Sequence, residues 1–234
     1  RMVPLLIVTP LESEFAALAA AIADQGSTLE DRPVGKLPGL ADADERFMIA
    51  QGGLGKSGFA LRVQHLMERL HDVSLVVCAG AAGSLSKTQT VGDVVVGTQT
   101  VEHDFYRKFR LRPPPRFDGD EASLAILRGI DPMLGTGSRV HFGPVASGDE
   151  DIVDPVRARE LHQSTGALAV AWEGAGGAKA CEFNDVRFLE VRGISDSADQ
   201  TAASDFARNL PLAMRNVASV LIKLAETAPR PILG

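Results

Sequence analysis

The chain has 234 residues, of which 45% are apolar, and it carries a formal net charge of −6 at pH 7. This length can fill a sizeable core, and we expect residues 1–234 to form one domain. The negative charge offers no broad attraction for nucleic acid or an anionic membrane surface, so we expect a small-molecule partner. Cys78 and Cys181 form no CxxC pair, which excludes a disulfide framework and indicates reduced, buried thiols.

The N-terminal segment predicts neither export nor a membrane span. Its apolar residues 5–8 are followed at once by Thr9 and Pro10. The run is therefore too short for a signal peptide or a transmembrane helix. We expect the protein to stay in the cytoplasm without a membrane partner.

Short apolar, β-branched runs alternate along the chain with segments of helical periodicity. The alternation is typical of a three-layer α/β sandwich, in which helices flank a mixed, mostly parallel central sheet. Ser13 is expected to cap the first helix, which Gly26 ends. In chain order we predict strands at 4–8, 47–50, 74–79, 92–99, 139–147, 168–172 and 187–195, and helices at 13–23, 58–71 and 201–227.

Residues 106–119 break this series. They contain three consecutive prolines and five Lys or Arg residues. Proline removes the backbone donor that a helix or an inner strand requires, so we expect a loop. The loop is either a solvated surface excursion or a lid or subunit contact beside a pocket.

Two glycine-rich segments follow predicted strands. Residues 51–56 read Gln-Gly-Gly-Leu-Gly-Lys, and residues 79–83 read Ala-Gly-Ala-Ala-Gly. Glycine allows tight turns and close approach to a ligand, but neither segment has the spacing of a Walker loop or a dinucleotide fingerprint. Turns at the carboxyl ends of two strands predict one shared crevice. Close packing of strands on helices is the alternative.

Acidic residues stand where predicted strands end. Glu12 and Glu14 follow the first strand, and Glu173 and Asp196 each follow a later apolar strand. The carboxyl ends of such strands meet at one edge of a sheet, so several acids there favour an acid–base site. Each acid alone could instead begin a helix or lie in solvent, and Asp196 could cap the last helix.

Longer motifs occur in an order that is more specific than any glycine pattern. Residues 191–200 read Val-Arg-Gly-Ile-Ser-Asp-Ser-Ala-Asp-Gln, 147–149 read Ser-Gly-Asp, 91–96 read Val-Gly-Asp-Val-Val-Val, and 53–56 read Gly-Leu-Gly-Lys. Over nearly the whole chain they resemble the nucleoside phosphorylase superfamily, closest to bacterial methylthioadenosine/S-adenosylhomocysteine nucleosidases. The resemblance implies that superfamily's fold and hydrolysis of the N-glycosidic bond of a purine nucleoside.

The resemblance also implies roles for individual residues. Asp196 corresponds to the acid that protonates N7 of the purine, and Ser195 would orient its carboxyl. Glu14 corresponds to the glutamate that activates water, with Arg192 beside that water. Glu173 corresponds to the carboxylate that binds the 2′ and 3′ hydroxyls of ribose.

Other residues would line the substrate pocket by the same resemblance. Asp151 stands where the nucleosidases have a phenylalanine stacked on adenine, and Trp172 where they have a methionine below the ribose. Ala81 replaces a serine. These departures change the pocket around the base and the ribose while the catalytic set is retained. The remaining pocket residues are Leu54, Ala82, Gly83, Ile152 and Phe206.

Two other functions stay open at this point. A phosphorylase of this superfamily needs an anion site with arginines, whereas residues 9–14 read Thr-Pro-Leu-Glu-Ser-Glu, and Cys78 and Ala79 precede the second glycine cluster. Glutamates in place of arginines repel phosphate and favour water. The other alternative is a non-catalytic nucleoside-binding or storage protein, which would not need the whole acid–base set.

The resemblance implies a homodimer whose 5′ subsite lies partly across the interface, shaped by Phe206 and by Phe105, Phe109 and Pro113 of the loop. The basic character of the loop could accommodate an acidic 5′ substituent, as in futalosine. We expect no cofactor and no metal, because the five histidines form no close ligand motif. His103 is expected to be structural or to line the pocket.

Overall fold

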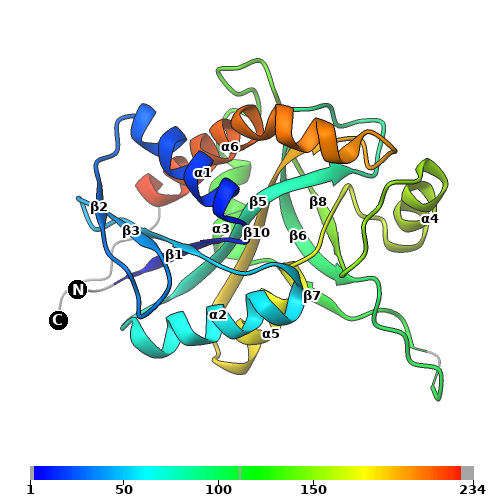
Figure 1. Ribbon diagram of the computed structural model, residues 1–234, viewed down its shortest axis with the longest axis horizontal. Coiled ribbons are helices and arrows are strands. Elements are labelled where there is room, and N and C mark those ends of the chain that lie inside the picture. The colour runs from blue at the N-terminus through cyan, green and yellow to red at the C-terminus, as the bar shows by residue number, and fades with distance from the viewer. Residues whose placement is uncertain (1–2, 111, 228–234) are drawn as a thin grey trace.

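The computed structural model describes residues 3–110 and 112–227, and a ten-stranded mixed sheet runs through its centre (Figure 1). Parallel pairs join β1 to β4 and β5, β5 to β10, and β8 to β6 and β9, while antiparallel pairs complete the sheet. The strands are β1 Leu5–Thr9, β2 Leu29–Asp31, β3 Gly39–Asp42, β4 Met48–Gln51, β5 Leu75–Ser84, β6 Val94–Glu102, β7 Arg116–Asp118, β8 Val140–Ser147, β9 Ala169–Ala171 and β10 Arg187–Asp196.

Part of the sheet closes on itself. Strand β10 pairs with β5 on one side and with β6 on the other, and β9 bridges β8 back to β5. The carboxyl ends of β1, β4, β5 and β10 point the same way because these strands are parallel. Polar side chains that follow these strands are therefore brought to one edge, where open α/β sheets place their ligands.

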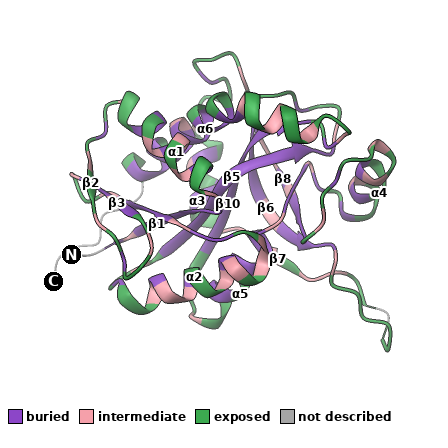
Figure 2. Ribbon diagram, in the orientation of Figure 1, coloured by how far each residue is buried: buried purple, intermediate pink, exposed green. Residues whose placement is uncertain are grey.

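Helices cover both faces of the sheet. Helices α1 (Glu12–Asp24), α3 (Glu121–Arg128) and α6 (Ala202–Thr227) pack on one face, and α2 (Gly55–Arg69) and α5 (Gly174–Phe183) pack on the other. Helix α4 (Pro155–Thr165) lies against β8. Figure 2 shows buried strands between helices whose outer faces are exposed. None of the helices among the described residues is long and apolar enough to cross a membrane.

Apolar periodicity explains how each helix meets the sheet. In α2, Phe59, Val63 and Leu66 recur at helical spacing and are all buried, as the sequence predicts. The Phe59 ring fits against the sheet because Gly52 and Gly177 leave room for it: a Cβ at either position would lie 2.5 and 2.8 Å from ring atoms. Strand and helix can therefore approach closely at this point.

The mixed sheet flanked by helices confirms the predicted fold class, with some local corrections. The second glycine cluster is not a turn, because β5 continues through it to Ser84. Ser13 does not cap α1, since the helix begins one residue earlier and the Glu14 carboxylate accepts the Leu11 N–H instead. Short or glycine-rich elements were not predicted: β2, β3, β7, α3, α4 and α5.

The predicted loop 106–119 is also corrected at its end. Residues after the prolines form β7, which pairs antiparallel with Gln99–Val101 of β6, beyond the part of β6 that pairs with β10. An edge position suits this segment because its outer backbone groups can face solvent. The rest of the loop projects from the body of the molecule (Figure 1), and Leu111 lies outside the described residues.

Removing the Phe59 ring should destabilise the fold. Phe59→Ala leaves a cavity between the sheet and α2, where the ring is fully buried, and should lower the free energy of unfolding by about 3–5 kcal/mol. Urea denaturation measures this. Leu61→Ala is the matched control in the same helix, because Leu61 is 73% exposed, and its effect should stay within about 0.5 kcal/mol. Equal losses in both variants would contradict this packing.

Candidate active site

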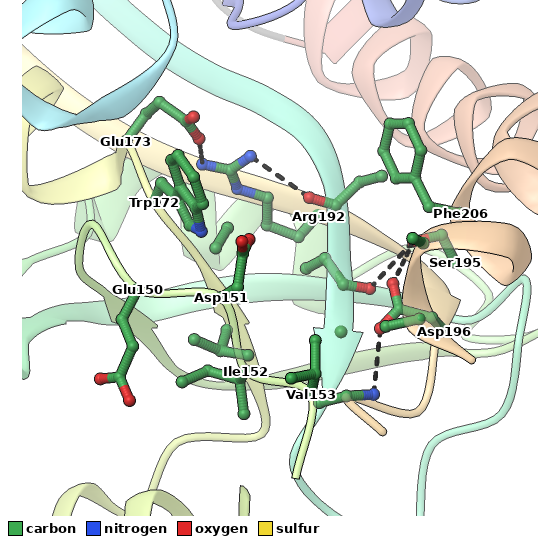
Figure 3. A pocket seen from close by; sticks show the side chains of 18 of the residues that line it. Glu150, Asp151, Ile152, Val153, Trp172, Glu173, Arg192, Ser195, Asp196 and Phe206 are labelled. Atoms are coloured by element: carbon green, nitrogen blue, oxygen red, sulfur yellow. Dashed lines mark hydrogen bonds and ion pairs between the residues drawn. The ribbon is translucent and has the colours of Figure 1, made fainter. Parts of the chain in front are cut away.

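A cavity of about 430 Å³ opens at the carboxyl-end edge of the sheet (Figure 3). This volume lies in the range that holds a small-molecule ligand. Apart from Phe105, Phe109 and Pro113 of the loop, the structure brings the predicted site residues to its wall: Glu14, Leu54, Ala81, Ala82, Gly83, Asp151, Ile152, Trp172, Glu173, Arg192, Ser195, Asp196 and Phe206. Further wall residues that sequence reasoning did not select include Leu11, Glu150, Val153 and Ala203. Loop and helix-start positions of this kind carry no pattern that marks them in advance.

Glu14 lies buried at the start of α1, whereas Glu12 is exposed and lies outside the cavity wall. Its carboxylate accepts the Ala81 N–H at 2.8 Å and the Leu11 N–H at 3.0 Å. Burial raises the pKa of Glu14 to about 7, although Arg192 opposes the shift. A carboxyl with this pKa can exchange a proton near neutrality.

Gly80 explains how Glu14 reaches this position. A Cβ on Gly80 would lie 2.7 Å from both Glu14 Oε1 and Arg192 Nη1, so only glycine admits the two side chains together. The second glycine cluster thus makes room for the charged groups of the site. Its backbone is an ordinary strand rather than a turn.

Glu173 stands at the N-terminus of α5, directly after β9. One carboxylate oxygen accepts the Gly55 N–H at 3.3 Å, and the other lies 3.4 Å from Arg192 Nη2. Burial raises the pKa of Glu173, and the positive charge of Arg192 opposes this. Glu173 is thereby fixed in place while its remaining lone pairs face the cavity.

The first glycine cluster supports this arrangement. Gly55 has a φ of +75°, a backbone conformation that L side chains rarely adopt. The turn at Gly55 aims two amides of the α2 N-terminus at carboxylates: the Gly55 N–H at Glu173, and the Lys56 N–H at Asp149, 2.8 Å away. The helix N-terminus, which favours anions, is occupied by the protein's own acids.

Arg192 is the buried cation of the site and is 1% exposed. Its Nη2 lies 3.2 Å from Cys78 Sγ as well as near Glu173, and its Nη1 lies 3.4 Å from the Ala81 carbonyl. Its Nε donates to Glu190 at 2.8 Å. The neighbouring carboxylates raise the pKa of Arg192, so the guanidinium stays charged. Cys78 and Glu190 were missed as members of the site, because they sit inside apolar strands.

Asp196 ends β10 at the other end of the cavity from Glu173 (Figure 3). Its Oδ2 accepts the Ser195 hydroxyl at 2.7 Å, and its Oδ1 accepts the Ala198 N–H at 3.0 Å. Burial raises the pKa of Asp196 despite these bonds. A Cβ at Gly83 would lie 2.8 Å from Oδ1, so this glycine admits the carboxylate. Asp196 does not cap α6, which begins at Ala202.

The wall between these groups is mostly apolar. Ile152 is buried, while Asp151 is exposed at the cavity mouth and lies on the same side as Trp172 in Figure 3. Glu150 points away from Arg192 and Asp196 in that view. It forms two 2.8 Å hydrogen bonds with Arg157 instead, and these hold the segment that carries Asp151 and Ile152.

The loop residues and His103 lie outside this wall. In the described chain, no residue of 103–118 lines the cavity. His103 is buried, and neither ring nitrogen has a hydrogen-bond partner among the described residues. Burial lowers the pKa of His103. This places His103 in a structural position rather than at the pocket. Nowhere in residues 3–110 and 112–227 do three His, Cys, Asp or Glu side chains gather in a group that could hold a metal ion.

Comparisons with known proteins find similar chains and similar folds. A 5'-methylthioadenosine/S-adenosylhomocysteine nucleosidase of Exiguobacterium sp. is 30% identical over 187 residues, which cover 76% of this chain and 79% of that protein. A nucleosidase of the same name from Helicobacter pylori, solved with butyl-thio-DADMe-Immucillin-A, has a TM-score of 0.83 at 24% identity and covers 97% and 99% of the two chains. Helicobacter pylori futalosine hydrolase has a TM-score of 0.82 at 23% identity and covers 96% and 97%.

At these identities the two solved structures are evidence for the fold alone. The family is shown independently by a model described as the phosphorylase superfamily, which matches residues 4–226. That span contains all of the carboxylates, and the arginine, that meet in the cavity. The chain therefore belongs to the phosphorylase superfamily.

Proposed function

We propose that this chain hydrolyses the N-glycosidic bond of a purine nucleoside of the methylthioadenosine/S-adenosylhomocysteine type, releasing the free base and a ribose derivative. One observation carries the proposal: Glu14 and Asp196, two buried carboxyls with raised pKa values, line one cavity together with the Arg192–Glu173 pair. A reaction that gives one proton and takes another requires such a pair. The name of the Exiguobacterium relative supports the substrate class.

Asp196 acts as the acid in this proposal. It gives its proton to N7 of the purine while the bond between C1′ and N9 breaks and its electron pair moves to the base. The base then leaves as a neutral molecule. Burial favours the protonated form of Asp196 before transfer, and the Ser195 hydroxyl fixes the direction of the carboxyl.

Glu14 acts as the base. As the oxygen of a water molecule bonds to C1′, Glu14 takes a proton from that water. Its two backbone hydrogen bonds, from Ala81 and Leu11, hold it rigidly for this transfer. Glu173 uses its free lone pairs to accept the 2′ and 3′ hydroxyls of ribose, which places C1′ relative to both carboxyls.

The electrostatics of the cavity favour water over phosphate as the attacking group. Among the described residues of the wall, Arg192 is the one basic side chain. Its guanidinium already faces Glu173 and Glu190, so it does not offer a free cation to an anion. Glu14 and Glu173 would repel phosphate at the same end. These features support hydrolysis over phosphorolysis.

We extend the proposal to assembly and location. The projecting loop exposes Phe105, Tyr106 and Phe109, and exposed aromatic side chains of this kind suit a contact with a second copy of the chain. A homodimer would bring this loop to the partner's cavity and complete the 5′ subsite. Cys78 and Cys181 are both free and buried, which fits a reducing compartment such as the cytoplasm.

The test is release of free base from methylthioadenosine, S-adenosylhomocysteine, adenosine, inosine and futalosine, each with and without phosphate. The proposal expects phosphate-independent release, fastest from one of the first two nucleosides. Strict dependence on phosphate with formation of ribose 1-phosphate would establish a phosphorylase. Binding without release of base from any of the five would support the storage role, and preference for futalosine would change the substrate class.

Asp196→Asn should fold normally and lose turnover by a factor of about 10² to 10⁴, because an amide cannot deliver the proton. Steady-state kinetics on the preferred nucleoside measure this. Asp199→Asn is the matched control three residues away, since Asp199 lies outside the cavity wall and its side chain binds Thr201. Near-normal turnover of Asp196→Asn would remove Asp196 from the mechanism.

The pH dependence should report Glu14. It must be ionised to accept a proton, so kcat/KM should rise with pH through about 7. The same raised pKa makes the folded protein bind a proton more tightly than the unfolded chain, so stability should fall between pH 4.5 and about 7. Glu14→Gln should remove most of both changes. A rate that is flat from pH 5 to 8 would argue against Glu14 as the base.

A further inference from the structure

Glu190 is a buried carboxyl that the proposed mechanism does not use. It lies on β10 two residues before Arg192, so both side chains point to the same face of the strand. Glu190 is 1% exposed and does not line the cavity. A buried carboxylate is expected to have a charged or hydrogen-bonding partner, because burying a charge costs free energy unless it is paired.

The contacts of Arg192 show what Glu190 does. The 2.8 Å bond from Arg192 Nε to Glu190 Oε1 is shorter than the 3.4 Å contacts of the two Nη atoms with the oxygens of Glu173 and the Ala81 carbonyl. The guanidinium is therefore anchored at its Nε end. The Nη end, which faces the cavity, is held more loosely.

The neighbours of Glu190 fix the anchor itself. Its second oxygen, Oε2, accepts the Thr100 hydroxyl of β6 at 2.5 Å. A Cβ on Gly174 would collide with the carboxylate, so the first residue of α5 must be glycine for Glu190 to sit there. Gly97 is similarly close, since its Cβ would lie 3.2 Å from that of Glu190. Strands β6 and β10 and helix α5 together hold the Glu190 carboxylate in one orientation.

Acidic groups outnumber basic groups in the buried space around Arg192. Three carboxyls, Glu14, Glu173 and Glu190, surround one guanidinium, that of Arg192, and Cys78 of β5 is the other titratable group beside it. One positive charge cannot neutralise three carboxylates in a buried space. The negative charge of Glu190 offsets part of the positive potential that Arg192 exerts on the glutamates that face the cavity, as its opposing effect on the pKa of Glu173 shows.

We propose that Glu190 is a positioning residue: its carboxylate holds Arg192 at Nε, and so sets the direction and strength with which the guanidinium acts on Glu14 and Glu173. This inference rests on the proposed function, because it assigns Arg192 to the groups that surround the attacked centre. Glu190 keeps Glu14 basic enough to take a proton from water.

The test compares the pH profile of kcat/KM for methylthioadenosine hydrolysis in wild type, Glu190→Gln and Glu190→Asp. Glu190→Gln removes the negative charge that offsets Arg192 near Glu14, so the acidic limb should move about one pH unit lower. The plateau should fall about tenfold, because the charged anchor at Nε is lost. Glu190→Asp keeps the charge, so its acidic limb should stay at the wild-type position while its plateau falls.

Asp42→Asn is the matched control. Asp42 is also buried and pairs with an arginine, Arg46, at 2.7 Å, but it lies on β3 outside the cavity wall. The Asp42→Asn variant should be less stable than the wild type and keep the wild-type pH profile of kcat/KM. A wild-type limb and plateau in Glu190→Gln would overturn the proposal. If that variant does not fold, Thr100→Val must lower the plateau, and wild-type kinetics there would overturn it equally.

A second readout separates this inference from the proposed function. The free energy of unfolding of the wild type should fall between pH 4.5 and about 7, where the folded protein keeps the Glu14 proton that the unfolded chain has lost, and Glu190→Gln should show a smaller fall. If no nucleoside is hydrolysed and this difference is observed, the function is wrong and the role of Glu190 stands. Equal slopes in both proteins would reject that role whatever the activity.

Discussion

The site depends on one constraint: a single buried arginine lies beside more carboxyls than its one positive charge can neutralise. Arg192 contacts Glu173 and Glu190 directly and lowers the pKa of Glu14 through space. Because burial opposes ionisation of the glutamates, the arginine cannot return their pKa values to the ordinary range. The cavity therefore contains one carboxyl, Glu14, that can exchange a proton near neutrality, which surface glutamates do not do.

The backbone completes this electrostatic arrangement. The Gly55 amide donates to Glu173, and the Ala81 amide donates to Glu14. The two glycine-rich segments therefore bind carboxylates of the protein itself. In other α/β proteins such segments cradle phosphate. Here the carboxylates of Glu14 and Glu173 occupy the positions that a bound anion would take. The same glycine-rich pattern therefore belongs to a site that disfavours anions. Whether the site favours water or phosphate as the attacking group is thus determined by the side chains that lie next to the glycines.

Much of the fold followed from local sequence. Long apolar runs such as β10 and the amphipathic helix α6 were predicted within a residue or two, because burial dominates there. The glycine-rich helix α5 was not, since Gly174, Gly176 and Gly177 have low helix propensity and the helix forms through tertiary packing. The resemblance placed Glu14 and Asp196 in the site, but Glu190 reads as one polar residue in an apolar strand. Only the spatial closeness of β6, β10 and α5 reveals its partners.

With a pKa of about 7, Glu14 should hold a proton in the folded protein at slightly acidic pH and lose it near neutrality. Infrared difference spectroscopy across a pH titration measures this directly through the C=O stretching band of protonated carboxyls. We expect a buried carboxyl band that disappears as pH rises through about 7 and is absent in Glu14→Gln. A spectrum with no such band between pH 5 and 9, or a band that Glu14→Gln leaves unchanged, would contradict it.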